Sequence, residues 1–398
     1  MEDVKLGEQA SELRDGMRIE WDVPISMDDD LVLRADIYRP VENGRYPVIM
    51  SYGPYGKGLL FEDLYADQWR RMVEAHPDVT SGSTNKYQNW EVVDPEKWVP
   101  DGYAVIRVDS RGAARSPGLL DIWSAREAKD FYDCIEWAAE QPWSNGKIGL
   151  NGISYYAMNQ WQVAALQPPH LTAMCIWEGA ADFYRDLSHH GGILCTFGRT
   201  WFPSQVITVQ HGQGTRGLRS AMNGDWISGP ATLSEEELGA NRREFYDDCY
   251  NNPLDAADYW QSRMPDWSKI TVPLFSAGNW ADRGSTRVAT SRASFARRLS
   301  TSGSRSTASN TGLSSTPTTA SICKRSFLVT FSSVRTPAGW TSRKCNFRYA
   351  IPENGLSNAT KTRGRCRAPN GPSSICTPPT LAFQANHRPR RARSPMAA

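Results

Sequence analysis

Apolar residues occur along this chain in short runs that alternate with segments of helical spacing. Runs typical of buried strands lie at 47–52, 103–109, 147–151, 171–177 and 272–277. Residues 125–140 and 157–166 place apolar side chains at the spacing of an amphipathic helix. Short apolar strands separated by helices are typical of a mostly parallel sheet that is covered on both faces. The pattern therefore predicts an α/β fold.

Two regions depart from this alternation. Residues 17–25 and 31–38 alternate in polarity around three aspartates, which indicates a β-hairpin. Residues 53–98 are polar and aromatic, and from about 185 to 267 the pattern is helical and polar without clear strands. The second region is expected to be a helical cap inserted between two strands of the sheet.

Composition changes abruptly at Gly284. The 114 residues that follow contain three lysines, sixteen arginines and a single acidic residue, Glu353. The formal charge is about −16 up to Gly284 and about +18 after it, so the net charge of +2 describes neither part. The tail is rich in Ser and Thr and has no sustained apolar period, so it is expected to be disordered. The alternative is a basic tail that binds polyanions by neutralising phosphates.

These patterns divide the chain into four segments. They are the first part of the core, the cap, a core strand, and the basic Ser/Thr/Arg-rich tail, at 1–184, 185–268, 269–284 and 285–398. The N-terminal residues show neither a basic region nor an apolar one of the signal-peptide kind, and no apolar run is long enough to cross a membrane. We therefore expect a cytoplasmic protein without a membrane partner.

The cysteines before Gly284 are widely spaced and contain no CxxC pair. They are Cys134, Cys175, Cys195 and Cys249. This spacing favours reduced thiols over disulfides or metal ligands. No metal site or cofactor is predicted.

Residues 152–156, Gly-Ile-Ser-Tyr-Tyr, stand between a predicted strand and a predicted helix. This is the context of a nucleophile elbow, in which a tight turn lifts a serine hydroxyl above the sheet and the next N–H faces a developing oxyanion. The usual motif has glycine two positions after the serine, where this chain has Tyr156. The alternative is an ordinary turn in which Ser154 is only the helix N-cap.

A family resemblance extends from about residue 20 to 284. It is carried by LRADIYRP, YGPYGK, DGYAVIRVDSRG with the following SPG, the long segment 125–166, GAADFYRD and VPLFSAGNWAD, in that order. Together these segments resemble the cocaine esterase / X-prolyl dipeptidyl-peptidase family of serine hydrolases, the CocE/NonD-type acyl esterases. The resemblance implies an α/β-hydrolase fold, hydrolysis of an ester, amide or short peptide through an acyl-enzyme, and no cofactor.

The resemblance also implies roles for four residues. Ser154 matches the nucleophile, and Asp282 matches the triad acid that orients a histidine. Tyr55 matches the tyrosine whose hydroxyl helps to form the oxyanion hole, and the backbone N–H of Tyr155 would be the second donor.

Other interpretations of individual residues stay open. Tyr55 could be a loop aromatic packed against the cap, and Asp282 could cap a turn or a helix. Asp109 and Arg111 are expected to form a structural pair behind the sheet rather than a catalytic one.

The expected base is missing from its place in the sequence. The resemblance puts the triad histidine some tens of residues after the acid, but only His387 follows Asp282, in a run of arginines. His189 and His190 lie in the predicted cap and could line a pocket, although cap residues without a catalytic role are the simpler interpretation. Turnover is therefore expected to be severely impaired.

The codons that can encode the tail suggest a cause. Codons compatible with residues 285–320, read two bases later, permit a family-like continuation when the free first bases are suitably chosen. It includes a histidine overlapping Asn310–Thr311, and residues 344–358 behave in the same way. We hypothesise a one-nucleotide frame disruption near the codon of Gly284, which would remove the last strand and helix of the sheet. A tail conserved in frame among close relatives would contradict this hypothesis.

The sequence leaves three classes open. They are a hydrolase impaired by the missing histidine, an enzyme whose base comes from elsewhere, and a non-enzymatic remnant or binding protein with a polyanion-binding tail. It does not choose among simple esters, β-lactam side-chain amides and X-Pro peptides, nor does it indicate an oligomeric state. No specific nucleic-acid partner is predicted.

Overall fold

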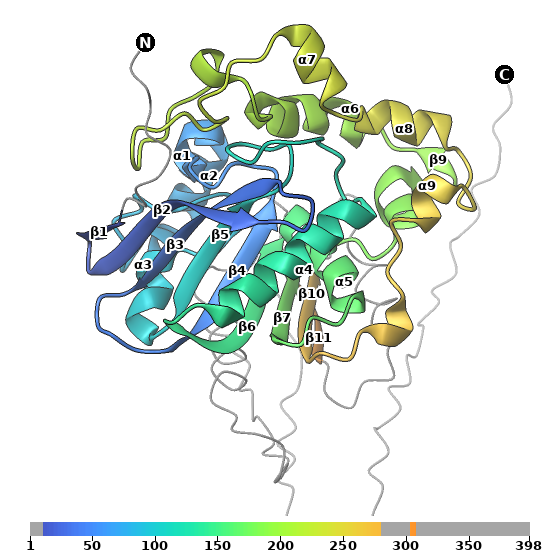
Figure 1. Cartoon of the computed structure of the whole chain (residues 1–398). Coiled ribbons are helices and arrows are strands. Elements are labelled where there is room, and N and C mark those ends of the chain that lie inside the picture. Colours follow the sequence, from blue (N-terminus) through green and yellow to red (C-terminus); the bar gives the residue numbers. More distant parts are fainter. Residues whose placement is uncertain (1–10, 280–302, 308–398) are drawn as a thin grey trace, which may run out of the picture. The chain divides into compact units, whose positions relative to one another are not determined.

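The structure is a computed structural model that describes residues 11–279 and 303–307. These residues form a nine-stranded sheet in the order β1-β2-β3-β5-β4-β6-β7-β10-β11 (Figure 1). The strands are β1 (Ser11–Arg14), β2 (Met17–Ser26), β3 (Val32–Pro40), β4 (Tyr46–Gly53), β5 (Ala104–Asp109), β6 (Ser144–Ile153), β7 (Leu171–Trp177), β10 (Leu274–Asn279) and β11 (Gly303–Thr307). The pairs from β1 to β5 are antiparallel, and those from β5 to β11 are parallel. The predicted hairpin and the five predicted core strands are confirmed.

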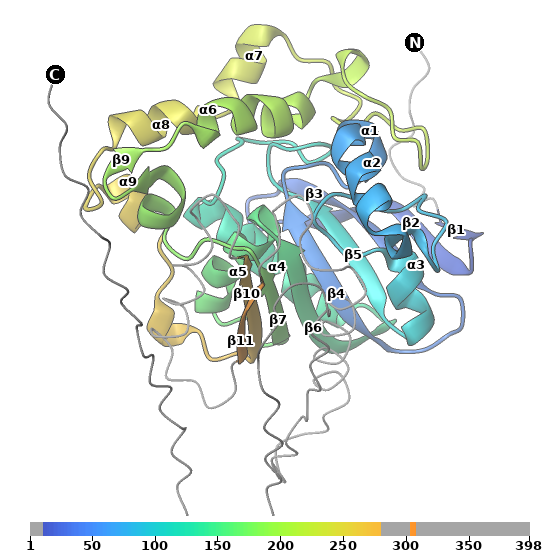
Figure 2. The ribbon, with the colours of Figure 1, turned by 180° about the vertical axis from the view of Figure 1, so that it is seen from behind.

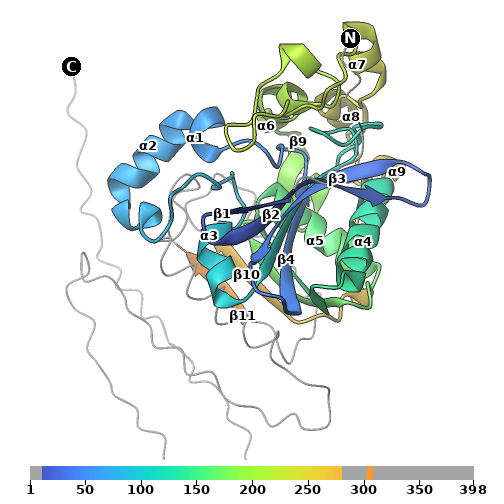
Figure 3. The same cartoon turned by 60° about the vertical axis from the view of Figure 1, so that its left-hand side comes forward.

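Helices cover both faces of the sheet. The long helices α4 (Ala125–Glu140) and α5 (Tyr155–Ala165) lie on one face. The short elements of segment 53–98 and its continuation gather on the opposite side (Figures 2 and 3). They are α1 (Phe61–Leu64), α2 (Ala66–Ala75), η1 (Pro77–Thr80), α3 (Pro95–Trp98) and η2 (Val99–Asp101). The sheet thus has the two covered faces that the apolar runs predict.

Alternate residues of the central strands supply the two cores. On β4, Val48 and Met50 pack beneath α4 and α5, whereas Ile49 between them joins the core on the other face. On β5, Ile106 and Val105 divide in the same way. Successive side chains of a strand point to opposite faces, so a strand buried on both sides needs a continuous apolar run.

The segment between β7 and β10, called the cap below, consists of short helices and one two-stranded ribbon. Its elements are η3 (Phe183–Ser188), β8 (His189–His190), β9 (Ile193–Leu194), α6 (Phe197–Trp201), η4 (Phe202–Val206), η5 (Ile207–Val209), η6 (Gly214–Arg216), α7 (Glu235–Ala240), α8 (Phe245–Asn251), α9 (Asp258–Gln261) and η7 (Trp267–Lys269). Figure 1 shows α6, α7 and α8 beyond one end of the sheet. Backbone bridges Ala113↔Gln210 and Leu120↔Arg242 join the cap to the loop that follows β5.

One strand lies where none was expected. Gly303–Thr307 of the basic tail pairs with β10 in parallel, from Phe275↔Gly303 to Asn279↔Thr307. Disorder is the expectation for the tail, whereas the structure gives these five residues as the strand β11. Strand pairing uses backbone N–H and C=O groups, so an edge strand can be extended by a segment that lacks an apolar pattern. The predicted disorder of the tail otherwise concerns residues outside the described ones.

Two further observations concern the described residues alone. Cys134, Cys175, Cys195 and Cys249 are not in disulfides. Among the helices of residues 11–279, none combines the length and the apolar character that a membrane crossing requires.

Candidate active site

Ser154 occupies a strained turn between β6 and α5. Its backbone has φ 56° and ψ −115°, a conformation that residues other than glycine rarely adopt, so the turn is strained. The Ser154 carbonyl oxygen accepts the N–H groups of Ala157 and Met158, while its own N–H donates to Trp177 at 3.0 Å. Ser154 stands at the N-cap position of α5, but its side chain makes no capping hydrogen bond. The hydroxyl is therefore not used to cap α5.

Tyr156 fits in the elbow because glycines face it. A Cβ atom added to Gly152 would lie 2.2 Å from Tyr156 Cβ and 2.6 Å from its carbonyl oxygen. A Cβ atom added to Gly53, at the end of β4, would lie 2.7 Å from the Tyr156 ring. Atoms that close must overlap, so both positions need glycine. The departure from the usual motif is thus accommodated by Gly53 on the neighbouring strand.

Tyr155, the first residue of α5, is held by a buried acid. Its hydroxyl donates to Glu127, at 2.7 Å from Oε1 and 2.8 Å from Oε2, and its ring stacks on Trp123 with centroids 4.5 Å apart. The first N–H groups of a helix have no acceptor within it, and the helix dipole favours negative charge there. The backbone N–H of Tyr155 is therefore one of the N–H groups that have no acceptor within α5.

Burial raises the pKa of Glu127 to about 7, although hydrogen bonds from Tyr155 and the Trp123 N–H oppose the shift. Since the pKa is higher in the folded than in the unfolded chain, the carboxyl destabilises the fold increasingly as the pH rises from about 4.5 towards 7. We expect Glu127→Gln to gain stability relative to the parent by about 2 to 3 kcal/mol between pH 5 and pH 8. Urea unfolding of both proteins at the two pH values measures this difference. A difference that stays constant with pH would contradict it.

Tyr55 lies in the loop after β4 and contacts the elbow. It is 4% exposed, and its ring packs edge-on against Tyr155 and Tyr156, with centroids 5.8 and 5.6 Å apart. Its hydroxyl oxygen accepts a hydrogen bond from the Trp201 indole Nε1 at 3.0 Å. Burial raises the pKa of Tyr55 well above its ordinary value, so the phenol keeps its proton. Both interpretations of Tyr55 agree with this packing, because it contacts cap and elbow together.

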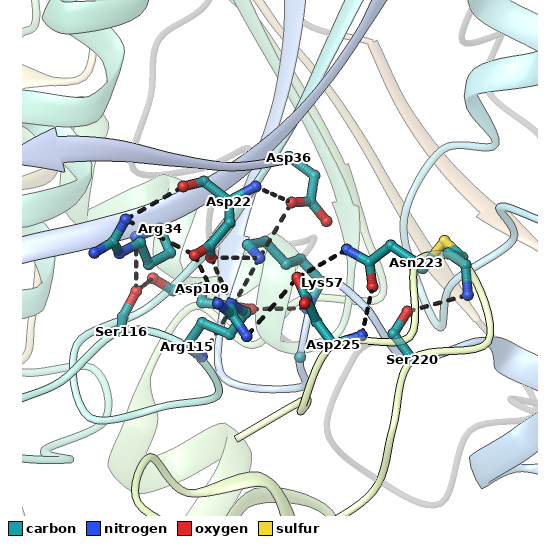
Figure 4. Close-up of polar contacts among 12 residues, drawn as sticks. Asp22, Arg34, Asp36, Lys57, Asp109, Arg115, Ser116, Ser220, Asn223 and Asp225 are labelled. Atoms are coloured by element: carbon teal, nitrogen blue, oxygen red, sulfur yellow. Dashed lines mark hydrogen bonds and ion pairs between the residues drawn. The ribbon is translucent and has the colours of Figure 1, made fainter. Parts of the chain in front are cut away.

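The loop of Tyr55 is anchored by Lys57. The Lys57 ammonium, on a side chain 4% exposed, lies 3.1 Å from Asp36, 3.3 Å from Asp22 and 3.6 Å from Asp109 (Figure 4). The Lys57 backbone N–H also donates to Asp109 Oδ1 at 2.7 Å. Asn89 Nδ2 donates to the Lys57 carbonyl oxygen at 2.7 Å. A buried charge is tolerated when it is paired in this way, so the ammonium and the backbone fix the loop together.

Arginines balance the carboxylates of this cluster. Arg115 binds Asp22 through Nε at 2.6 Å and Nη2 at 2.8 Å. Burial raises the pKa of Asp22, but the hydrogen bond from Arg115 and the charges of Lys57, Arg115 and Arg34 outweigh it and lower the pKa to about 2. Arg115 Nη1 also donates to the Trp226 carbonyl oxygen at 3.1 Å, which ties the cluster to the cap.

The expected pair of Asp109 with Arg111 is wrong. Asp109 contacts Lys57, whereas Arg111 Nε lies 2.7 Å from the buried Asp130 and its Nη1 2.9 Å from Asp29. Side chains that follow a strand end can leave in different directions, so closeness in sequence did not decide the partners.

Asp282, the predicted triad acid, lies outside the described residues. The strand that leads to it, β10, pairs with β7 through Ala277↔Trp177. Trp177 is also the residue whose carbonyl oxygen accepts the Ser154 N–H. Only β7 lies between β10 and β6, the strand that leads into the elbow. The carboxyl ends of these strands form the edge of an α/β sheet at which ligands bind.

The two cap histidines have partners within the cap. His189 stacks on Tyr184 with centroids 4.5 Å apart, and its Nδ1 lies 3.0 Å from Ser188 Oγ. His190 Nε2 lies 2.9 Å from the Asp186 carbonyl oxygen. Burial lowers the pKa of His189. Neither histidine is hydrogen-bonded to Ser154 among the described residues, and His387 lies outside them.

Three residues that support the candidate site were not predicted from the sequence. Glu127 contacts Tyr155 and Trp201 contacts Tyr55, across 28 and 146 positions of the chain. Lys57 supports Tyr55 by fixing the loop that both residues share. The YGPYGK motif contains Lys57, so a lysine two residues after a candidate catalytic tyrosine was the one available signal.

Comparisons with known proteins identify relatives of this chain. The family model "X-Pro dipeptidyl-peptidase (S15 family)" matches residues 29–295. Cocaine esterase from Rhodococcus sp. is 32% identical over 163 residues, which cover 41% of this chain and 24% of the esterase. A putative Xaa-Pro dipeptidyl-peptidase from Bacillus cereus is 28% identical over 129 residues, which cover 28% of this chain and 20% of that protein. The chain thus matches only a part of each curated relative.

A solved structure gives the same result for the fold. A CocE/NonD family hydrolase from Staphylococcus aureus superposes with a TM-score of 0.64 at 32% identity. The superposition covers 79% of this chain and 50% of that one. The fold is therefore that of the α/β-hydrolases of this group.

Proposed function

The chain belongs to the X-Pro dipeptidyl-peptidase (S15) family, and from this premise we propose that its site is built for acyl transfer from an ester or amide bond to Ser154. The observation that carries the proposal is the strained elbow at Ser154, whose hydroxyl takes no part in capping α5. The substrate class is a small ester, an amide or a short peptide, and the reaction requires no cofactor.

The proposed reaction has two halves. Ser154 Oγ attacks the carbonyl carbon, and the carbonyl oxygen becomes an oxyanion that the Tyr55 hydroxyl and the Tyr155 N–H stabilise. A histidine oriented by Asp282 would take the serine proton and pass it to the leaving group. Water then attacks the acyl-enzyme, the same base takes its proton, and Ser154 is released with the carboxylic acid.

The sequence has no histidine near Asp282 that could act as the proposed base. Only His387 follows the acid, and His189 is engaged by Ser188 and Tyr184. We therefore propose that both halves of the reaction are slow in this chain. The oxyanion donors can still accelerate acylation, because they act without the base.

A covalent assay tests the nucleophile. When the purified chain is incubated with excess 4-nitrophenyl acetate, we expect no rapid burst but a slow, stoichiometric acetylation of Ser154, which accumulates because deacylation lacks a base too. Mass spectrometry of the peptide containing Ser154 follows the adduct, with Ser154→Ala as the control. An adduct-free serine would refute the proposed nucleophile. Repeated turnover that Ser154→Ala abolishes would show that a base exists and that the impairment is wrong.

A further inference from the structure

We infer that Trp201 of the cap is a positioning residue for the oxyanion hole, since its indole N–H orients the hydroxyl of Tyr55. The inference rests on the proposed role of Tyr55 in acyl transfer. Helix α6, which ends at Trp201, would then help to orient an oxyanion donor as well as cover the site.

The indole is held so that its N–H has one direction. Trp201 is 5% exposed, and its ring stacks with those of Trp123 and Phe197, each with its centroid 5.6 Å away. The ring of Phe245 is nearly perpendicular to the indole, with centroids 5.7 Å apart. A buried ring that contacts several other rings cannot turn without displacing them. The Nε1 atom therefore stays 3.0 Å from the Tyr55 hydroxyl oxygen.

This hydrogen bond decides which way Tyr55 can donate. An indole N–H is only a donor, whereas a phenol hydroxyl both donates and accepts. With the Trp201 N–H occupying a lone pair of its oxygen, the Tyr55 O–H must point elsewhere, and the rings of Tyr155 and Tyr156 place the elbow beside it. An accepted hydrogen bond also polarises the O–H and makes it a better donor. Both effects favour donation to an oxyanion formed on Ser154.

The test uses Trp201→Phe, which keeps the aromatic packing and removes the N–H. Loss of one such hydrogen bond should slow the acetylation of Ser154 by 4-nitrophenyl acetate by roughly three- to tenfold. The matched control is Trp260→Phe. Trp260 is also a fully buried cap indole, and its Nε1 donates to the Asn252 carbonyl oxygen at 2.7 Å. The control should leave the acetylation rate unchanged, although it loses a comparable bond.

A double-variant cycle separates positioning from general packing. In a Tyr55→Phe background there is no hydroxyl to orient, so Trp201→Phe should then change the rate by less than twofold, on the order of the error of such cycles. An equal loss in both backgrounds, or no loss in either, would overturn the inference while Ser154 and Tyr55 keep their proposed roles. A parent rate that neither Ser154→Ala nor Tyr55→Phe lowers would refute the proposed function, and the inference with it.

A second measurement does not depend on acylation. In protein labelled with ¹⁵N-tryptophan, the indole N–H signal that disappears in Trp201→Phe is assigned to Trp201. Tyr55→Phe should move this signal upfield, because its acceptor is lost, and should leave the Trp260 signal in place. An unmoved Trp201 signal would show that the hydrogen bond is not formed and would overturn the inference.

Discussion

The chain as it stands should hydrolyse an activated ester on the order of a million times more slowly than the same chain with its reading frame restored after Gly284. In a Ser-His-Asp triad the base takes part in both acylation and deacylation, so its loss affects kcat as much as the loss of the serine. The measurement is kcat for 4-nitrophenyl acetate on both proteins, made from genes that differ by one nucleotide near the codon of Gly284.

The control is Ser154→Ala in the restored protein, which should return its rate to that of the present chain. A residual acceleration of roughly a thousandfold over water is compatible with this prediction, because the oxyanion donors and substrate binding remain. Equal kcat values for the present and restored chains would contradict both the frame hypothesis and the missing base.

Removal of the Lys57 charge should destabilise the fold by about 3 to 5 kcal/mol, which is typical when one partner of a buried ion cluster is deleted. Lys57→Met leaves Asp36 and Asp109 buried without the ammonium that lies 3.1 and 3.6 Å away. Burial already raises the pKa of Asp109 to about 6, against the lowering effect of Lys57. Without the lysine this pKa rises further above its unfolded value, so the loss should grow as the pH increases from 5 to 8.

The free energy of unfolding, measured in urea at both pH values, checks this prediction. Lys86→Met is the matched control, since the Lys86 side chain is 62% exposed and its ammonium lies 3.5 Å from the Asp15 carboxylate. An exposed pair of this kind contributes at most about 1 kcal/mol. Equal effects of the two substitutions would show that the buried cluster is no stronger than a surface pair.

The sequence predicted those elements whose signal is local. The apolar runs of β4 to β7 and of β10 indicated strands, since a strand covered on both faces must be apolar throughout. The helices α1 and α2 escaped notice because their segment is polar and aromatic, with no buried residue in either helix. The strand β11 escaped notice because backbone pairing leaves no apolar pattern.

The residues of the candidate site also divide into those with a local sequence signal and those without one. The turn at Ser154 could be predicted because its signal is local, and its strained backbone agrees with the elbow motif. Lys57 and Trp201 were missed because their partners, such as Asp36 and Tyr55, come from other elements, and no spacing along the chain encodes those contacts. The partner of Arg111 was predicted wrongly for this reason too.

The order of the strands in the sheet limits how early the chain can fold while it is being synthesised. Strand β4 is made before β5 and β6, yet it lies between them, and Val48 pairs with Ala104 on one side and Ile148 on the other. Until residues up to Ile153 have emerged, β4 therefore lacks its neighbour β6, and Lys57 lacks the Asp109 carboxylate until β5 has emerged. Contacts between distant segments form late and leave apolar edges exposed in the meantime. A nascent chain that stalls between β4 and β6 should accordingly be a substrate for chaperones.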